Sequence, residues 1–224
     1  MRTFSFSTGT KAYGPYGRLY RNAAGTVFGT TEYTIDAPYH GTVFAISPAA
    51  PVLSGVVSRK VHAAAGTFDL PLTGPATNPT TEPRTGNAGG NHTIVFTFNK
   101  SITAGAAAVI AGAGTAGTPT FNGSEMTVPL SGVTNAQYLT LSVSGVASAD
   151  GGTGGGGSVR IGFLQSDVNG SRAVTLSDLL LVDAALTQPL IAANYLRDVD
   201  LSGNITLSDK LVVNADLTRI LPAP

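Results

Sequence analysis

Two stretches near the C-terminus repeat each other, and this duplication constrains the fold more than any other feature of the chain. DVNGSRAVTLSDLLLVDAAL begins at Asp167 and DVDLSGNITLSDKLVVNADL begins at Asp198, and the two agree at 11 of 20 positions. Both stretches have oxygen-bearing side chains at positions 1, 3, 5, 9 and 12. A calcium ion requires six to eight oxygen ligands that converge from a short turn. The duplication therefore predicts two calcium-binding loops.

The same spacing assigns a set of oxygen ligands to each loop, with position 7 contributing its backbone carbonyl and position 9 acting through a water. In the first loop the ligands are Asp167, Asn169, Ser171, Ala173, Thr175 and Asp178. In the second loop they are Asp198, Asp200, Ser202, Asn204, Thr206 and Asp209. The first loop offers two carboxylates and the second offers three, so we expect tighter calcium binding at the second site.

Each loop runs into an apolar segment with helical periodicity. After position 12, apolar residues recur at i, i+3, i+4 and i+7, which predicts helices from Leu179 and Lys210 that pack on each other. Ser177 and Ser208 are candidate helix caps. The β-branched residues at position 8, Val174 and Ile205, are expected to pair the two loops as a miniature ladder.

This duplicated loop and helix resembles type I dockerin domains over residues 164–221. Two departures concern position 5, where Ser171 and Ser202 replace the usual acidic or Asn residues, and position 6 of the first loop, where Arg172 replaces a turn-forming glycine. The resemblance implies a small helical module of the paired F-hand type, organised by Ca²⁺, with a cohesin-like protein partner. It also implies that the partner contacts positions 10 and 11, which are Leu176, Ser177, Leu207 and Ser208. The alternative is that Leu176 and Leu207 belong to the core.

Residues 54–163 have the pattern of a β-sandwich. Short segments with alternating polarity are separated by turn sequences such as NAGGN, AGAGTAG and FNGSE. The predicted strands lie in VVSRKVHAAAGTFDLPL, HTIVFTF, EMTVPLSG, YLTLSVSGV and SVRIGF. The run from VFTFNKSITAG to LSVSGVASADG resembles bacterial Ig-like domains of cell-surface proteins. The GGTGGGG run at 151–157 predicts a flexible loop before the last strand. The expected fold is thus mainly β, an Ig-like sandwich followed by the helical module at 164–224.

Residues 1–53 contain a second, smaller repeat. GTVF occurs at 25–28 and again at 41–44, separated by the turn-prone DAPYHG, which predicts a β-hairpin. The surrounding sequence also resembles one copy of a short repeat found in large secreted proteins of Verrucomicrobia and Gloeobacter, where tandem copies are thought to form propeller-like sheets. A single repeat cannot bury its own face. We therefore expect this segment to end an array or to lend its strands to a neighbouring sheet.

Composition and charge exclude several classes of function. The net charge is zero, split as +3 before residue 163 and −3 from there on, so no basic patch suited to nucleic acid is predicted. The chain has no cysteine, which excludes disulfides and thiolate metal sites, and no apolar run long enough to span a membrane. The first ten residues lack an apolar signal region. We expect an extracellular or cell-surface protein whose export signal lies outside this chain.

The sequence also argues against catalysis. His40, His62 and His92 lie in unrelated contexts that favour surface or strand positions, and the nucleophile-elbow, P-loop and HExxH motifs are missing. We therefore predict that the chain is no enzyme but the C-terminal region of an exported bacterial protein, with a calcium module that serves in anchoring or assembly through a protein partner. Two alternatives remain. The module folds back on its own sandwich with calcium as a structural ion, or the chain self-assembles as a surface subunit.

Overall fold

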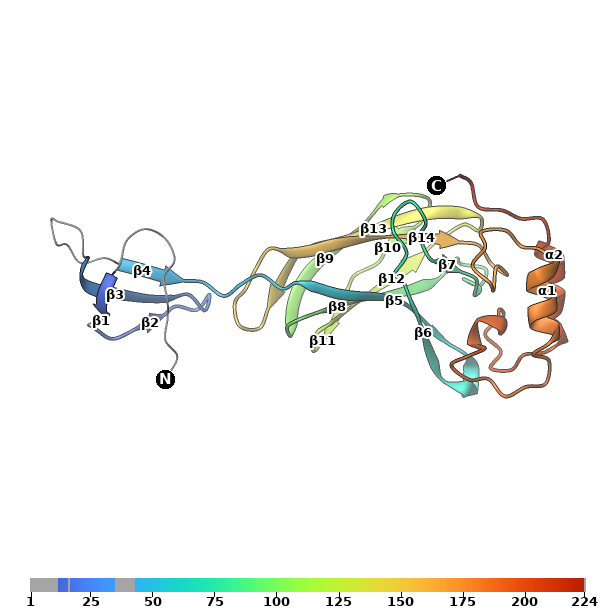
Figure 1. The fold of residues 1–224 in the computed structure, drawn as a ribbon, viewed down its shortest axis with the longest axis horizontal. Helices are drawn as coiled ribbons and strands as arrows, with labels where there is room; N and C mark the ends of the chain where they lie inside the picture. The colour runs from blue at the N-terminus through green and yellow to red at the C-terminus, as the bar shows by residue number, and fades with distance from the viewer. Residues whose placement is uncertain (1–11, 16, 35–42, 224) are drawn as a thin grey trace.

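The computed structural model describes residues 12–15, 17–34 and 43–223, whose strands form three sheets. Figure 1 shows an elongated molecule in which a small N-terminal sheet, a central body of two sheets and a helical module follow one another along the long axis. The small sheet and the helical module lie at opposite ends of the central body. The predicted class, mainly β, is confirmed.

The N-terminal sheet has strand β3 at its centre, paired with strands on both sides. Its members are β1 (Ala12–Pro15), β2 (Tyr20–Arg21), β3 (Val27–Thr34) and β4 (Val43–Ile46). β3 and β4 are antiparallel with Val27 opposite Ile46, so the hairpin predicted from the two GTVF copies is confirmed. Residues 36–41, the predicted turn, lie outside the described residues together with His40.

Two sheets form the central body and share one core. The first sheet contains β5 (Leu53–Val61), β6 (Thr67–Pro71), β8 (His92–Phe98), β10 (Thr115–Ala116), β11 (Thr120–Asn122) and β12 (Glu125–Ser131). Its strand order is β10-β12-β8-β5-β6, and β11 also pairs with β12. The second, in the order β7-β14-β13-β9, contains β7 (Thr81–Glu82), β9 (Ile102–Ala111), β13 (Gln137–Ser148) and β14 (Gly155–Phe163). Alternate residues of β12 and β13, such as Met126 and Leu141, are buried in a single apolar cluster between the sheets. We call this body the sandwich.

Two parts of the sandwich differ from the sequence prediction. β9 was not predicted, because the small residues at its centre, 104–108, lack the β-branched and aromatic side chains that mark strands, although such residues occur at both of its ends. The loop predicted over 151–157 is wrong at its end, because Gly155–Gly157 already belong to β14. A Cβ at Gly155 would lie 2.6 Å from the carbonyl oxygen of Pro51, so these glycines let the chain that enters β5 pass close to the strand.

The C-terminal module packs two short helices on a second apolar cluster. Its elements are α1 (Leu176–Asp183), the 3₁₀ turn η2 (Tyr195–Arg197) and α2 (Leu207–Asp216), and another 3₁₀ turn, η1 (Ala63–Ala65), faces it from the sandwich. Val182 and Val213, one from each helix, are fully buried in this cluster. Both helices begin three residues earlier than predicted. In the described part of the chain, no helix has the length and apolar character needed to cross a bilayer.

The caps of the two helices correct the prediction that Ser177 and Ser208 hold this role. The N-cap residues are Thr175 and Thr206, whose side chains accept the backbone N–H groups of Ser177 and Ser208. The third helical residue of each helix, Asp178 or Asp209, closes the cap by accepting the N–H of the threonine. Each closing carboxylate of the predicted calcium loops therefore also starts a helix.

A buried histidine predicts acid sensitivity of the sandwich. His92 in β8 is 7% exposed and packs edge-on against Phe163 with ring centroids 4.5 Å apart. Burial, reinforced by the charge of Lys60, lowers its pKa to about 3. In the unfolded chain this histidine binds a proton near pH 6.5, whereas in the folded protein it stays neutral until about pH 3. Its contribution to the free energy of unfolding therefore falls as the pH drops from about 6.5 towards 3. We expect this histidine to contribute a loss of about 2 kcal/mol between pH 7 and 4.5, measured by urea unfolding as the difference between the unmodified protein and a variant that lacks it.

The control for this acid effect is His92→Gln, which keeps a polar side chain but cannot titrate. Between pH 7 and 4.5, the variant should lose about 2 kcal/mol less stability than the unmodified protein. Equal slopes in both proteins would assign the acid sensitivity to other groups.

Candidate metal centre

The two predicted calcium loops have the same internal hydrogen bonds. In the first loop, Asp167 Oδ1 accepts the N–H of Ser171 at 2.9 Å and Asp167 Oδ2 accepts the N–H of Arg172 at 2.8 Å. Asp198 makes the equivalent bonds to Ser202 and Gly203 at the same distances. At position 12 of both loops, the closing carboxylate accepts the backbone N–H of position 3 at 3.2 Å. The serine hydroxyl at position 5 donates to the carbonyl of Ala173 or Asn204 at 3.0 Å. The repeat is therefore preserved in three dimensions as well as in sequence.

Three carboxylates converge in the second loop. One oxygen from each of Asp198, Asp200 and Asp209 lies within 4.8 Å of the others, and Asp198 and Asp209 are fully buried. Burial, together with the charges of Asp200 and Asp198, raises the pKa of Asp209 to about 6. Burial acts in the same direction on Asp200, but hydrogen bonds from the Ser208 and Ser202 hydroxyls outweigh it and lower the pKa of that group. A cation at this point would relieve the repulsion between the carboxylates.

The first loop brings together the same positions with one charge fewer. Asp167 and Asp178 are buried, and Asn169 stands where the second loop has Asp200. Burial raises the pKa of Asp167, and the Asp178 carboxylate adds to this effect. All candidate ligands of both loops are oxygen atoms, a donor set that suits a hard cation such as calcium better than zinc or copper.

The turn inside each loop requires left-handed backbone at positions 4 and 6. Gly170 and Arg172 have φ values of 70° and 72°, and Leu201 and Gly203 have values of 64° and 85°. Each loop thus has one glycine and one strained residue, but at exchanged positions. The first loop therefore has its glycine at position 4 and a non-glycine residue, Arg172, at position 6. The second loop has the reverse, with Leu201 at position 4 and its glycine at position 6.

The expected ladder between Val174 and Ile205 is wrong. Val174 instead pairs with the segment after α2, accepting the N–H of Thr218 at 3.0 Å. Ile205 accepts the N–H of Thr187, after α1, at 3.1 Å. Thr187 and Thr218 occupy equivalent positions of the two repeats, 31 residues apart, as do Val174 and Ile205. Each loop is therefore hydrogen-bonded to the segment that follows the helix of the other repeat. The side chains of Val174 and Ile205 are buried in the core instead of forming a ladder.

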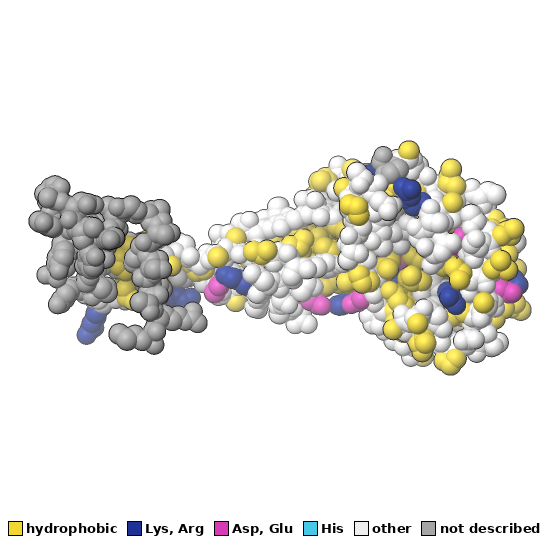
Figure 2. Space-filling model, viewed as in Figure 1, with side chains coloured by type: hydrophobic (Ala, Val, Ile, Leu, Met, Phe, Trp, Pro, Cys, Tyr) yellow, Lys and Arg dark blue, Asp and Glu magenta, His cyan; other side chains and the backbone are white. Residues whose placement is uncertain are grey.

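The predicted partner residues are at the surface. Leu176 and Leu207 are 66% and 65% exposed, so the alternative that they form core is wrong. One turn further along each helix, Leu180 and Leu211 are 65% and 67% exposed. Each repeat therefore presents a matching pair of leucines, which we call the leucine faces. A mainly apolar groove lies beside Leu207 and is lined by Leu186, Pro189 and Ile205. Figure 2 shows apolar side chains spread over this end of the molecule among few charged groups.

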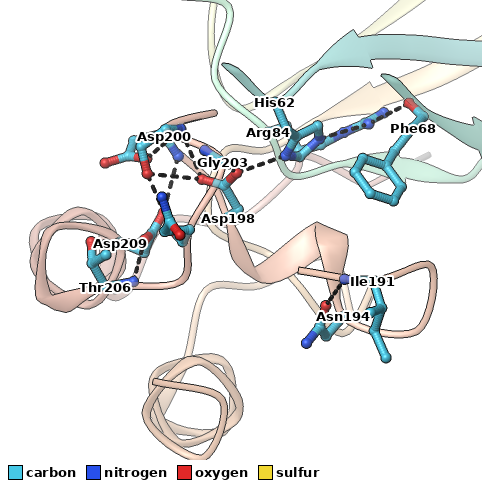
Figure 3. A network of polar contacts seen from close by, with 12 residues as sticks. His62, Phe68, Arg84, Ile191, Asn194, Asp198, Asp200, Gly203, Thr206 and Asp209 are labelled. Atoms are coloured by element: carbon cyan, nitrogen blue, oxygen red, sulfur yellow. Dashed lines mark hydrogen bonds and ion pairs between the residues drawn. The ribbon is translucent and has the colours of Figure 1, made fainter. Parts of the chain in front are cut away.

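Sequence reasoning missed one residue at the second loop. His62 follows β5 in the sandwich and is fully buried, and its Nδ1 atom lies 2.8 Å from Asp198 Oδ2 (Figure 3). The two residues are 136 positions apart, and nothing in the sequence around His62 connects it to a calcium loop. The sequence predicts a surface or strand position for each histidine. His62 and His92 are both buried, so the surface position is wrong for these two.

Comparisons with known proteins add no assignment to this geometry. No protein-family model matches the chain, and no significant similarity was found to a curated protein or to a solved structure. The candidate centre therefore rests on the residues and contacts described above.

Gly203 predicts that the second loop tolerates little change where it meets the sandwich. A Cβ at this position would lie 2.8 Å from the His62 carbonyl oxygen, whereas a Cβ at Gly170 would meet nothing within 4 Å. Both glycines have a positive φ, so alanine at either should cost about 1 kcal/mol of backbone strain. We expect Gly203→Ala to cost roughly 1 kcal/mol more than Gly170→Ala in urea unfolding. Equal losses of stability in the two variants would mean that the backbone at His62 moves aside at no measurable cost.

Proposed function

We propose that residues 164–221 form a dockerin-like, calcium-organised attachment module and that the chain is non-catalytic. The observation that carries this proposal is the matched pair of loops, in which the same hydrogen bonds gather carboxylates on the same spacing twice. Metal binding would offset the repulsion among Asp198, Asp200 and Asp209, so that calcium affinity contributes to folding of the module. Loop two would bind more tightly than loop one, because it has the additional carboxylate.

The two leucine faces support docking to a protein partner. Leu176 with Leu180, and Leu207 with Leu211, occupy equivalent places on α1 and α2, and large apolar side chains exposed in matching pairs are typical of interaction surfaces. Calcium would fix the two helices against each other and so preserve the spacing of these faces. In this proposal the module attaches an exported bacterial protein to a cohesin-like partner outside the cell.

The test of the partner is binding of a purified type I cohesin domain, measured by calorimetry in calcium and in chelator. Because the faces are equivalent, Leu176→Asp or Leu207→Asp alone should weaken binding only a few-fold, and the double variant should abolish it. Ile110→Asp, at an exposed position of β9 in the sandwich, is the control and should bind normally. If no cohesin binds the unmodified protein in calcium, the cohesin partner is wrong, while the metal site is judged by its own experiment.

The N-terminal sheet supports a second candidate, self-assembly of a surface subunit. Tyr20 and Val43 are 65% and 77% exposed, and the sheet stands apart from the sandwich core (Figure 1). Strands with open edges can pair with those of a neighbouring molecule. Sedimentation at several protein concentrations tests this candidate, and a monomer throughout would refute it.

A further inference from the structure

The second loop is joined to the sandwich through its first ligand. His62 and Asp198 are both fully buried, and His62 Nδ1 lies 2.8 Å from Asp198 Oδ2 (Figure 3). In the described part of the chain, Asp167, the equivalent residue of the first loop, receives bonds only from its own loop. This contact is therefore an asymmetry between two loops that are otherwise built alike.

The hydrogen-bond donors around His62 determine which of its nitrogens carries the proton. Arg84 Nη1 lies 3.4 Å from His62 Nε2, and a guanidinium group can only donate. Nε2 must therefore be the unprotonated, accepting nitrogen, which places the proton of the neutral ring on Nδ1. His62 consequently donates to Asp198. Arg84 is itself held by a double hydrogen bond to Glu82, at 2.8 and 2.7 Å, so the orientation of the imidazole is fixed from the sandwich side.

The two oxygens of the Asp198 carboxylate accept hydrogen bonds from different groups. Oδ2 accepts from His62 and from the N–H of Gly203, both at 2.8 Å. Oδ1 remains among the groups of the loop, where it accepts the N–H of Ser202 at 2.9 Å. Two donors on one oxygen fix the plane of the carboxylate before any cation arrives. Hydrogen bonds to the outer side of a metal ligand set its orientation and affect affinity strongly.

Several other contacts hold the same segment against the sandwich. Thr85 donates its N–H to the carbonyl of Val199 at 2.9 Å, one residue after Asp198. The Tyr195 ring stacks on Phe68 with centroids 5.1 Å apart, and its hydroxyl donates to the Asp69 carbonyl at 3.0 Å. The start of the second loop is therefore part of the interface between sandwich and module.

We propose that His62 is a positioning residue for the cation site of the second loop, and that cation binding there is coupled to docking of the module on the sandwich. The inference rests on the proposed calcium site and extends it. Because coupling between two equilibria is reciprocal, docking raises the affinity of this loop for calcium, and calcium tightens docking. The first loop also begins beside the sandwich, where Ser166 donates its N–H to the Pro83 carbonyl at 2.9 Å. Its Asp167 carboxylate accepts hydrogen bonds from its own loop and none from a sandwich side chain in the described residues, so we expect its affinity to depend less on docking. The sandwich thus becomes part of one calcium site and not of the other.

The test reads the two loops separately by calcium calorimetry on the full chain. With the first loop disabled by Asp178→Asn, the variant His62→Ala should weaken calcium binding about 10- to 100-fold. His62→Asn should stay within about threefold of the parent, because its amide N–H can replace the Nδ1 donor. With the second loop disabled by Asp209→Asn, His62→Ala should leave the remaining site unchanged. That last result guards against general unfolding, which would weaken both loops alike.

The amide of Thr85 measures docking directly, because it donates across the interface. In the Asp178→Asn protein, calcium should slow hydrogen exchange of this amide at least tenfold, and His62→Ala should remove most of the slowing. Unchanged calcium affinity in His62→Ala, equal weakening of both loops, or a Thr85 amide indifferent to calcium would each overturn the inference. If the unmodified chain takes up no calcium, the proposed function fails first, an outcome distinct from these three.

Discussion

Asp209→Asn is expected to destabilise the module in calcium and to leave it unchanged or more stable in chelator. Without metal, the Asp209 carboxylate is buried beside Asp200 and Asp198, which raises its pKa to about 6, and the neutral amide relieves this repulsion. With metal, the variant loses a ligand. A site at a free calcium concentration 100 times its Kd stabilises the folded state by about 2.7 kcal/mol, so a loss of this size is expected. Thermal melts in calcium and in chelator measure both effects.

The sign reversal between the two melts is the decisive feature of this experiment. Asparagine keeps an acceptor for the Thr206 N–H, so the helix cap survives. The bond from the Asp200 N–H to the other oxygen is lost in calcium and in chelator alike, so it does not change the difference between the two melts. Asp178→Asn in the first loop is the matched control and should show a smaller loss in calcium. A proportional loss with and without calcium would identify Asp209 as a helix cap with no metal role.

The pH dependence of the metal-free protein follows from the same carboxylate. A pKa raised to about 6 means that the folded state binds this proton more tightly than the unfolded chain, where the group titrates near 4. Its contribution to stability is therefore complete below about pH 4 and lost as the pH rises through 6. Calcium competes with the proton for the same oxygen atoms, so calcium affinity should increase over that range.

The sequence predicts most of what is local in this fold. The loop positions from Asp167 to Asp178 and from Asp198 to Asp209 depend on spacing alone, and the structure bonds them within each loop as the repeat suggests. Strands with alternating burial, such as β12, were also readable from period and turn residues. The alanine-rich β9 was not, because its place in the sheet is set by its pairing with β13 and not by its own residues.

Long-range contacts and the burial of charged groups could not be predicted from the sequence. His62 is 136 residues from Asp198. Glu82 and Arg84 are only two positions apart, but no periodic pattern indicates that their ion pair is buried. The exchange of partners by Val174 and Ile205 depends on how the two repeats pack, which a pattern within one repeat does not specify. Burial of charged groups is decided by the packing of both sheets and the module together, so it emerges only from the assembled fold.

Arg84→Met is expected to be the most damaging single change in the sandwich. The Arg84 and Glu82 side chains are fully buried and doubly hydrogen-bonded, and Arg84 also donates to the carbonyls of Phe68 and Ser58 at 2.9 and 2.8 Å. Removing the guanidinium leaves the Glu82 charge buried without a partner, which typically costs about 3–5 kcal/mol. Arg59→Met is the control, because its ion pairs with Asp69 and Glu125 are about one third exposed. It should cost at most about 1 kcal/mol.

The pH dependence of the deficit identifies its cause. In the unmodified protein, burial opposes ionisation of Glu82, but the Arg84 charge and hydrogen bonds outweigh it and hold the pKa at about 2. This group therefore stabilises the fold above about pH 4.5 and loses that contribution only as the pH falls through 2. In Arg84→Met, the largest influence on Glu82 is burial, which favours the protonated form, so the deficit in urea unfolding should be larger at pH 7 than at pH 4. Glu82→Leu combined with Arg84→Met should recover part of the loss, because no buried charge remains. A deficit that is constant with pH, or a double variant as unstable as the single one, would trace the loss to packing and not to the stranded charge.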